Sequence, residues 1–265
     1  MHSITNYGHM IADRVRMNAH WKALQQAITS ESVVLDIGCG VGIMTMLACR
    51  AGAKRVYAIE PEEWINTAKK LAAVNGFSNK IEFIQGLSSQ ITLPERADVI
   101  VSDLRGVLPL FQHHLPDIVD ARERLLAPDG QLIPESDQVW AAVVEAPEVY
   151  KLYEEPWKES TSGLDLSAAE QLAKNAWRKA RFTAESLLSE PVCWAALHYQ
   201  KVTDPDVKRT IELTIARPGT AHGLAVWFDA LLLEGCHYSN SPSAPPLVYG
   251  QAFFPWTLAC GITRH

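Results

Sequence analysis

The sequence predicts an α/β protein in which a doubly wound, parallel sheet is followed by a second, mainly antiparallel unit. Between residues 33 and 60, an apolar run, a glycine-rich turn, a helix pattern and a second apolar run follow one another. Strand and helix patterns then alternate as far as residue 133, which is typical of a parallel sheet. After residue 135 most of the patterns are β-type, which indicates a separate antiparallel unit.

Residues 10–28 come before the first predicted strand and carry apolar residues at intervals of three and four, with few helix breakers. This spacing predicts one or two amphipathic helices. Arg14 and Arg16 on this segment are candidates to lie over a bound carboxylate, and an ordinary solvated helix face explains them equally well.

The apolar run at residues 33–37 fits a strand that is buried on both faces. Gly38, Gly40 and Gly42 follow it directly. Glycines at alternate positions remove the Cβ atoms that would keep a ligand away from the backbone, and they permit the positive φ values of a tight turn. We call this turn, residues 38–42, the glycine corner.

A helix over residues 43–50 and a second strand over residues 56–59 follow, and Glu60 ends that strand. An acid at this position binds ribose hydroxyls in doubly wound sheets, so we expect a ligand that contains adenosine. A dinucleotide fingerprint would place its third glycine at position 43, where this chain has Ile43. The alternative is a purely structural turn.

Asp36 precedes the glycine corner and gives the pattern D-I-G-C-G-V-G. This pattern resembles motif I of class I S-adenosylmethionine-dependent methyltransferases. The resemblance implies S-adenosyl-L-methionine as the cofactor, with Asp36, Gly38 and Gly40 near its methionine portion and Glu60 at its ribose.

Further along the chain, the patterns predict a helix at residues 62–73, strands at 81–84 and 97–102, and a helix at 109–126 that leads through a Pro-Asp-Gly turn into a strand. In a methyltransferase the loop at residues 85–90 faces the adenine, so Ser88 and Ser89 are candidate contacts. Asp103 follows the strand at 97–102, at the sheet edge where open α/β sheets bind substrates.

We expect the second unit to begin near Pro134, which gives domains at residues 1–134 and 135–265. Its predicted β-type runs are residues 139–145, 192–200, 210–215, 224–233 and 248–260. A charged segment at residues 167–188 has a helical pattern.

The composition limits the classes of function. A formal charge of -6, with no dense cluster of Lys or Arg, argues against general nucleic-acid binding. No long apolar run and no signal-peptide core are present, so we expect a cytoplasmic protein that does not bind membranes. The five cysteines contain no C-x-x-C pair, which predicts reduced core residues and neither a disulfide framework nor a metal site.

The chain also resembles the protein arginine methyltransferase family over most of its length. The segments that carry the resemblance are MIADRVRM, VVLDIGCGVGIMTMLACRAGAKRVYAIE, ARERLLAPDGQLIPE, GLDLS and AVWFDALLLEGCHYSNSPSAPPLVYGQAFF. The resemblance implies a Rossmann-like cofactor domain, a β-barrel domain and an inserted helical dimerisation arm, which residues 167–188 match by position. It also implies a homodimer and places Arg16 at the carboxylate of the cofactor.

The loop that would bind the acceptor departs from the family pattern. The family carries two glutamates, in patterns like S-E-W-M-G-Y and Y-E-S-M, whereas this chain reads S-D-L-R-G-V and F-Q-H-H. Asp103 therefore replaces the first glutamate, the neutral amide of Gln112 replaces the second, and Arg105 adds a positive charge. A guanidinium acceptor loses a charged partner in such a loop. The family's Thr-His-Trp loop appears here as Leu-Val-Tyr at residues 247–249.

The proton that leaves the acceptor during methyl transfer needs a base. Asp103, His113 and His114 are the available bases in the loop, and Asp103 is expected to orient the acceptor while one histidine takes the proton. The alternative is that both histidines are surface or helix-start residues, because neighbours on a helix face different directions.

The leading interpretation is a methyltransferase that uses S-adenosylmethionine to methylate a nitrogen or oxygen of a small molecule or peptide. One alternative is a genuine protein or free arginine N-methyltransferase, in which Asp103 and Gln112 hold the guanidinium. A second is a non-catalytic protein that binds the cofactor and serves as a partner. An NAD-dependent oxidoreductase is disfavoured by Ile43.

Overall fold

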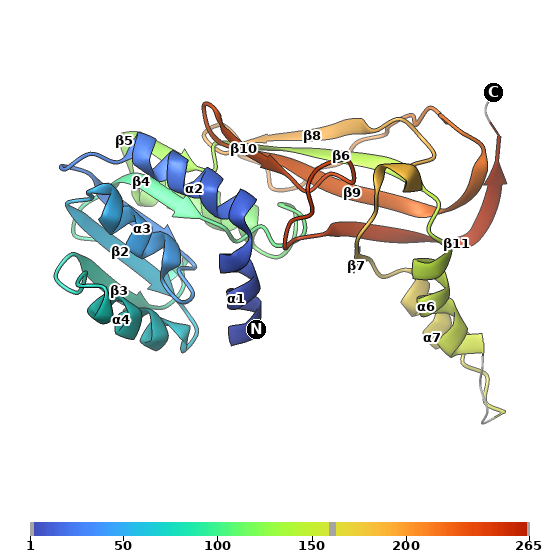
Figure 1. The fold of residues 1–265 in the computed structure, drawn as a ribbon, viewed down its shortest axis with the longest axis horizontal. Coiled ribbons are helices and arrows are strands. Elements are labelled where there is room, and N and C mark those ends of the chain that lie inside the picture. The colour runs from blue at the N-terminus through green and yellow to red at the C-terminus, as the bar shows by residue number, and fades with distance from the viewer. Residues whose placement is uncertain (1–2, 159–162, 264–265) are drawn as a thin grey trace. The chain divides into compact units, whose positions relative to one another are not determined.

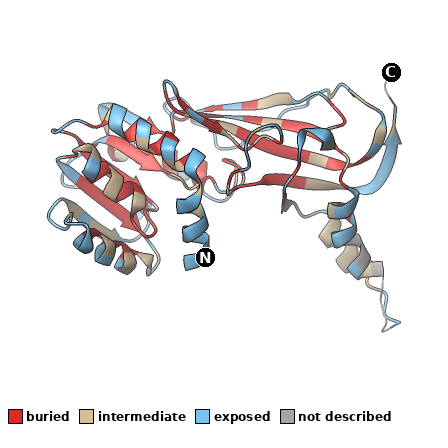
Figure 2. Cartoon of the chain, in the orientation of Figure 1, coloured by how far each residue is buried: buried red, intermediate tan, exposed pale blue. Residues whose placement is uncertain are grey.

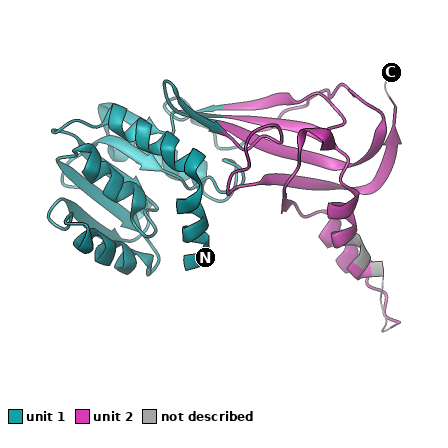
Figure 3. Ribbon diagram, in the orientation of Figure 1, with its two compact units in different colours: residues 1–137, 197–206, 230–238 teal, residues 138–196, 207–229, 239–265 magenta. Residues whose placement is uncertain are grey.

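The chain forms two compact units, and the structure, a computed structural model, describes residues 3–158 and 163–263 (Figure 3). The first unit consists of residues 1–137, 197–206 and 230–238, and the second of residues 138–196, 207–229 and 239–265. The sequence suggested one boundary near Pro134. In the structure, residues 197–206 and 230–238 also belong to the first unit, because they pack against it.

A parallel sheet of five strands forms the centre of the first unit (Figure 1). Its order is β3-β2-β1-β4-β5. The strands are β1 (Val33–Ile37), β2 (Arg55–Glu60), β3 (Ile81–Gln85), β4 (Ala97–Ser102) and β5 (Leu126–Ile133). The strand order reverses between β1 and β4, so the carboxyl ends of these two strands flank the crevice where such sheets bind ligands. The predicted parallel sheet is confirmed.

Helices alternate with these strands. They are α1 (Ile4–Ala12), α2 (Arg14–Ala27), α3 (Ile43–Ala51), α4 (Trp64–Val74), the short η1 (Ser88–Gln90) and α5 (His114–Arg124). Two helices precede β1, and Asp13 separates them because its carboxylate accepts the backbone N–H of Arg16 at 3.1 Å and caps α2. Within the two described ranges, no helix has the length and apolar character needed to cross a membrane.

Helix α5 begins at His114, later than the predicted start at residue 109. Gly106 and Gln112 have φ values of +55° and +56°, which no α-helix accommodates. Residues 103–113 therefore form a turn-rich loop between β4 and α5, which we call the acceptor loop.

The second sheet has the order β7-β11-β9-β6-β8, and β10 pairs with β9. Its strands are β6 (Ser136–Val144), β7 (Arg178–Ala180), β8 (Val192–His198), β9 (Gly219–Leu233), β10 (Cys236–Ser239) and β11 (Gln251–Ile262). β11 pairs antiparallel with β7 and β9. Trp227 and Phe253 belong to the apolar core that these strands bury in the second unit (Figure 2). The predicted antiparallel unit is confirmed.

The helical segment of the second unit begins at Ser167 as predicted, but it ends earlier and a second helix precedes it. Helices α6 (Pro147–Lys158) and α7 (Ser167–Lys174) pack against each other, and α7 ends at Lys174, not near residue 188. Residues 178–180 instead pair with β11, and only the short η2 (Ala184–Ser186) follows. Pairing with a neighbouring strand has overridden the helical pattern of this charged sequence.

The strand predicted at residues 210–215 is also wrong. Ile211, Leu213 and Ile215 do alternate with more exposed neighbours. However, only Ile215 forms a bridge, with Ser189, so this extended segment has no continuous hydrogen-bonded partner. Alternating apolar and polar residues indicate a segment that is buried on one face. To form a strand, the segment also needs a hydrogen-bonded partner of matching length.

The five cysteines are all free. Cys39, Cys49 and Cys236 are buried as expected, while Cys193 is half-buried and Cys260 is exposed on β11. The prediction of core positions therefore holds for three of the five.

Candidate active site

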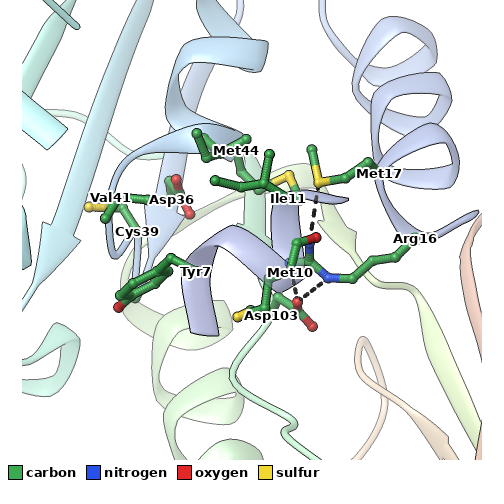
Figure 4. A pocket seen from close by; sticks show the side chains of 12 residues that line it. Tyr7, Met10, Ile11, Arg16, Met17, Asp36, Cys39, Val41, Met44 and Asp103 are labelled. Atoms are coloured by element: carbon green, nitrogen blue, oxygen red, sulfur yellow. Dashed lines mark hydrogen bonds and ion pairs between the residues drawn. The ribbon is translucent and has the colours of Figure 1, made fainter. Parts of the chain in front are cut away.

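A pocket in the first unit lies at the carboxyl ends of β1 and β4, and side chains from α1 and α2 face it (Figure 4). It is lined by Tyr7, Met10, Ile11, Arg16, Met17, Asp36, Gly38, Cys39, Val41, Ile43, Met44 and Asp103. Segments separated by up to 96 positions in the chain, from Tyr7 to Asp103, thus meet in the crevice that the strand order predicts.

The glycine corner leaves no room for side chains at two positions. A Cβ on Gly38 would lie 2.4 Å from Cδ2 of Leu104, and one on Gly40 would lie 2.5 Å from Cε1 of Tyr7. Both glycines also have positive φ, +71° and +54°. The backbone N–H groups of Gly38 and Cys39 donate to the carbonyl of Ile59 at 2.9 Å, which fixes the corner against the end of β2.

Glu60 is connected to the same corner. Its side chain is buried, and its two oxygens accept the backbone N–H groups of Gly40 at 2.8 Å and Glu62 at 3.0 Å. A carboxylate has about four acceptor positions, so two remain for hydroxyl donors. This geometry fits the predicted binding of a ribose.

Asp36 on β1 is 3% exposed and accepts a hydrogen bond from the Thr45 hydroxyl at 2.5 Å. Burial raises the pKa of Asp36 to about 7, against the opposing effect of the Thr45 hydrogen bond. A cationic amino group bound next to Asp36 would stabilise the charged carboxylate.

Arg16 and Asp103, which are 87 positions apart, form a buried ion pair. Nε of Arg16 donates to Oδ2 of Asp103 at 2.8 Å, and Nη2 donates to the same oxygen. Nη1 donates to the Met10 carbonyl and contacts Sδ of Met17, both at 3.2 Å. The predicted cofactor-carboxylate residue and the predicted acceptor-orienting residue thus lie together in one pocket.

Behind Asp103, the acceptor loop places a second guanidinium. Arg105 is fully buried, its Nη1 lies 2.8 Å from Oδ1 of Asp137, and its Nε lies 3.5 Å from Oδ1 of Asp103. The guanidinium also lies over the ring of Tyr238 at 5.6 Å. Tyr199 donates a hydrogen bond to Oδ2 of Asp137.

The three remaining predicted catalytic residues are neighbours in the chain but lie in different environments, and none of them lines the pocket. Gln112 and His113 are exposed on the acceptor loop, whereas His114 is 1% exposed and its Nε2 lies 3.0 Å from the Tyr199 hydroxyl. Burial, assisted by the positive charge of Arg105, lowers the pKa of His114 to about 3. His114 is therefore a weak base at neutral pH, and its position favours the helix-start alternative. The roles of Gln112 and His113 stay predictions.

Ser88 and Ser89 lie in η1 after β3. Ser88 is buried and its carbonyl accepts a hydrogen bond from Arg124 at 2.8 Å, while Ser89 is exposed. Neither lines the pocket around Asp36, and their predicted contact with adenine stays a prediction.

Sequence analysis missed Tyr7. Its ring lies against Gly40 and edge-on to Trp64, with 5.4 Å between the ring centroids. Burial, followed by the charge of Glu60, raises its pKa. The spacing of Tyr7, Met10 and Ile11, three and then one residue apart, is a helical pattern that would have extended the predicted helix toward the N-terminus. Asp137, Tyr199 and Tyr238 have no local pattern that marks them.

Comparisons with known proteins agree with this geometry. Residues 19–135 match the family model described as ribosomal protein L11 methyltransferase (PrmA). The chain is 33% identical to protein arginine N-methyltransferase 1 of Schizosaccharomyces pombe over 257 residues, which cover 92% of this chain and 74% of that protein. The chain belongs to the protein arginine N-methyltransferase family.

Other members of the protein arginine N-methyltransferase family give the same result. A probable protein arginine N-methyltransferase 6 of Arabidopsis thaliana is 31% identical over 92% of this chain and 57% of its own length. Among solved structures, a Trypanosoma brucei PRMT1 enzyme-prozyme heterotetrameric complex with AdoHcy has a TM-score of 0.86 at 23% identity, over 97% of this chain and 84% of that chain. Arabidopsis thaliana protein arginine methyltransferase 10 has a TM-score of 0.85 at 22% identity, over 99% and 85%. These two structures share the fold.

This chain is accordingly an S-adenosylmethionine-dependent methyltransferase of the arginine methyltransferase type. S-adenosylmethionine is its cofactor, and the residues fit it: the glycine corner has no Cβ atoms in the way, and Glu60 has free acceptor positions. Membership of this family excludes the alternative of an NAD-dependent oxidoreductase.

Proposed function

We propose that the acceptor is a guanidinium nitrogen of arginine, in a protein, a peptide or the free amino acid. Two observations support this. The named relatives are arginine N-methyltransferases, and the pocket has, besides Asp36 on β1, the carboxylate of Asp103 at the carboxyl end of β4. Asp103 carries the proposal, because a guanidinium is best held by a carboxylate through charge-assisted hydrogen bonds.

Each pocket residue has a task in this proposal. Bound S-adenosylmethionine supplies a methyl group on a positively charged sulfur. Glu60 would accept the ribose hydroxyls, Asp36 would accept the amino group, and Arg16 would donate to the carboxylate of the cofactor. Asp103 accepts N–H groups of the acceptor and holds the reacting nitrogen in line with the methyl–sulfur bond.

The proposed methyl transfer forms one bond, breaks one bond and releases one proton, and the pocket residues account for each of these. The acceptor nitrogen would form a bond to the methyl carbon as the carbon–sulfur bond of the cofactor breaks toward sulfur, and the nitrogen would lose one proton. Asp103 is the carboxylate that receives this proton or passes it to water. The proposal does not use His114 as the base, because its side chain is buried against Tyr199, does not line the pocket and has a lowered pKa.

A second candidate is a neutral nitrogen or oxygen acceptor of a small molecule or peptide. The observation that favours it is that Asp103 is already paired with Arg16 and lies 3.5 Å from Arg105, while Gln112 supplies no second carboxylate. A neutral acceptor does not need the missing charge.

Methyl transfer from labelled S-adenosylmethionine tests these candidates. The acceptors are an arginine-rich peptide, the same peptide with lysine at every arginine, free arginine and a set of neutral amines and alcohols. We expect label on the arginine peptide or free arginine, and its loss in Asp103→Asn. Label only on a neutral acceptor supports the second candidate. Binding of S-adenosylhomocysteine without turnover of any acceptor supports a non-catalytic partner protein and contradicts the proposal.

We also propose a homodimer formed through the arm, meaning helices α6 and α7 and the residues around them. Leu152, Leu164 and Leu172 are 69%, 65% and 74% exposed, and Trp177 is 40% exposed. Several large apolar side chains that are exposed on one short segment indicate a protein interface.

A further inference from the structure

Arg105 is the most unusual residue of the acceptor loop. It is fully buried, and a guanidinium does not lose its charge in a protein. Burial opposes the charge of Arg105, but the carboxylates of Asp137 and Asp103 outweigh this effect and raise its pKa. A permanent positive charge therefore lies inside the first unit, next to the carboxylate that is proposed to bind the acceptor.

The position of this guanidinium is fixed from several sides. Asp137 holds Nη1 at 2.8 Å, and Tyr199 donates to the other oxygen of Asp137. The ring of Tyr238 covers the guanidinium at 5.6 Å from its centroid. With 0% exposed side-chain surface, Arg105 has no route to solvent without opening this part of the unit.

Two carboxylates from different segments thus contact Arg105, Asp137 at 2.8 Å and Asp103 at 3.5 Å. The family pattern binds the guanidinium of its acceptor with two glutamates and has a methionine where this chain has Arg105. In this chain an internal guanidinium is paired with two acids, one of which the acceptor would use.

We propose that Arg105 is a specificity-determining residue that competes with a cationic acceptor for Asp103. This inference rests on the proposed function of Asp103. The charge of Arg105 weakens the binding of an arginine guanidinium and leaves the binding of a neutral acceptor unchanged, so that it sets the preferred charge of the acceptor. Arg105 acts through Asp103 and does not itself contact the acceptor.

Three variants test this inference. Arg105→Met removes the charge, and Arg105→Met/Asp137→Asn removes it together with the buried acid that it would leave without its ion-pair partner. Arg105→Lys is the matched control, because it retains the charge. Steady-state kinetics with the arginine-rich peptide are combined with equilibrium binding of that peptide in the presence of S-adenosylhomocysteine. Thermal unfolding and S-adenosylhomocysteine binding show which variants are folded.

We expect both charge-removing variants to bind the arginine peptide at least about tenfold more tightly than wild type, through KM and not kcat. Arg105→Lys should behave like wild type, and KM for a neutral acceptor should not change. Equal peptide affinity in wild type and the folded double variant overturns the inference, even if wild type methylates arginine and the proposed function stands. If wild type ignores arginine but the double variant binds and methylates it, the inference stands and the proposed function of the natural chain fails.

Discussion

In the proposed function, Asp103 is the residue that connects cofactor binding with acceptor binding. Arg16 donates to it from α2, and Arg105 lies beside it in the acceptor loop. In the proposed function Arg16 would bind the carboxylate of the cofactor in addition to Asp103.

At the same scale, Asp36 makes cofactor binding depend on pH. Its pKa of about 7 in the free protein means that a proton must leave before the carboxylate can pair with the amino group. The affinity for S-adenosylhomocysteine should therefore increase as the pH rises toward 7, by up to about tenfold per pH unit, and level off above it. Calorimetric titrations across this range measure the effect.

Asp36→Asn is the control for this prediction. The variant should bind more weakly and lose the pH dependence. An affinity of the wild type that stays constant between about pH 6 and 8 would contradict the assignment of Asp36 to the amino group.

Glu60→Gln should weaken the binding of S-adenosylhomocysteine by about tenfold to one hundredfold, because charge-assisted hydrogen bonds to the ribose contribute roughly 1.5 to 3 kcal/mol. Glu63→Gln, three positions further on and exposed, is the matched control and should bind like wild type. Isothermal titration calorimetry distinguishes the two. Equal losses in both variants would show that general charge, and not a ribose contact, causes the effect.

At the scale of elements, the acceptor loop and the arm show how context overrides local pattern. Positive φ at Gly106 and Gln112 delays α5, so that His114 becomes a buried first residue of the helix and Gln112 stays exposed. In the arm, the helical pattern after residue 175 gives way to pairing of β7 with β11. The first difference follows from the local backbone of the acceptor loop, and the second from pairing with a segment distant in sequence.

The arm also supplies a prediction about assembly. Leu172 on α7 is 74% exposed, and Leu172→Asp should convert the proposed homodimer to a monomer, since a charge would have to be buried in an apolar contact. Gln171→Glu adds the same charge at the neighbouring exposed position and should leave the dimer intact. Light scattering after size-exclusion chromatography gives the masses. A wild-type monomer, or dimers of both variants, would contradict an interface at Leu172.

At the scale of the whole molecule, the first unit is assembled from three stretches of the chain. Asp137, Tyr199 and Tyr238 come from the ends of β6, β8 and β10, and they surround Arg105, which belongs to the acceptor loop. The two units are therefore not independent segments of sequence, and a break near Pro134 removes all three of these partners.

A fragment of residues 1–134 should consequently be less stable than the first unit in the full chain by about 3 to 5 kcal/mol from Arg105 alone, because the fragment lacks Asp137 and buries an unpaired charge or opens to hydrate it. Circular dichroism during urea unfolding measures this. Arg105→Met in the fragment should recover part of the loss, whereas the same substitution in the full chain should be destabilising. A wild-type fragment as stable as its Arg105→Met counterpart would contradict a structural role for the Arg105–Asp137 pair.

The sequence by itself determined the parallel sheet, the glycine corner and its link to Glu60, because these depend on residues within one βαβ unit whose spacing is fixed by the backbone. It also determined the class of cofactor and the position of Asp103 at the sheet edge. Asp36 and Glu60, the terminal acid of β2, are recognised from the residues next to them in the chain.

Only the tertiary structure decided which groups surround Asp103. Arg16 and Asp103 are 87 positions apart, and Asp137, Tyr199 and Tyr238 reach Arg105 from segments after the predicted domain boundary. Local sequence patterns report periodicity and turn preference, and they contain no information on which distant side chains meet. The charge available to an acceptor is a sum over those distant side chains, so it follows from the packed fold and not from the acceptor loop alone.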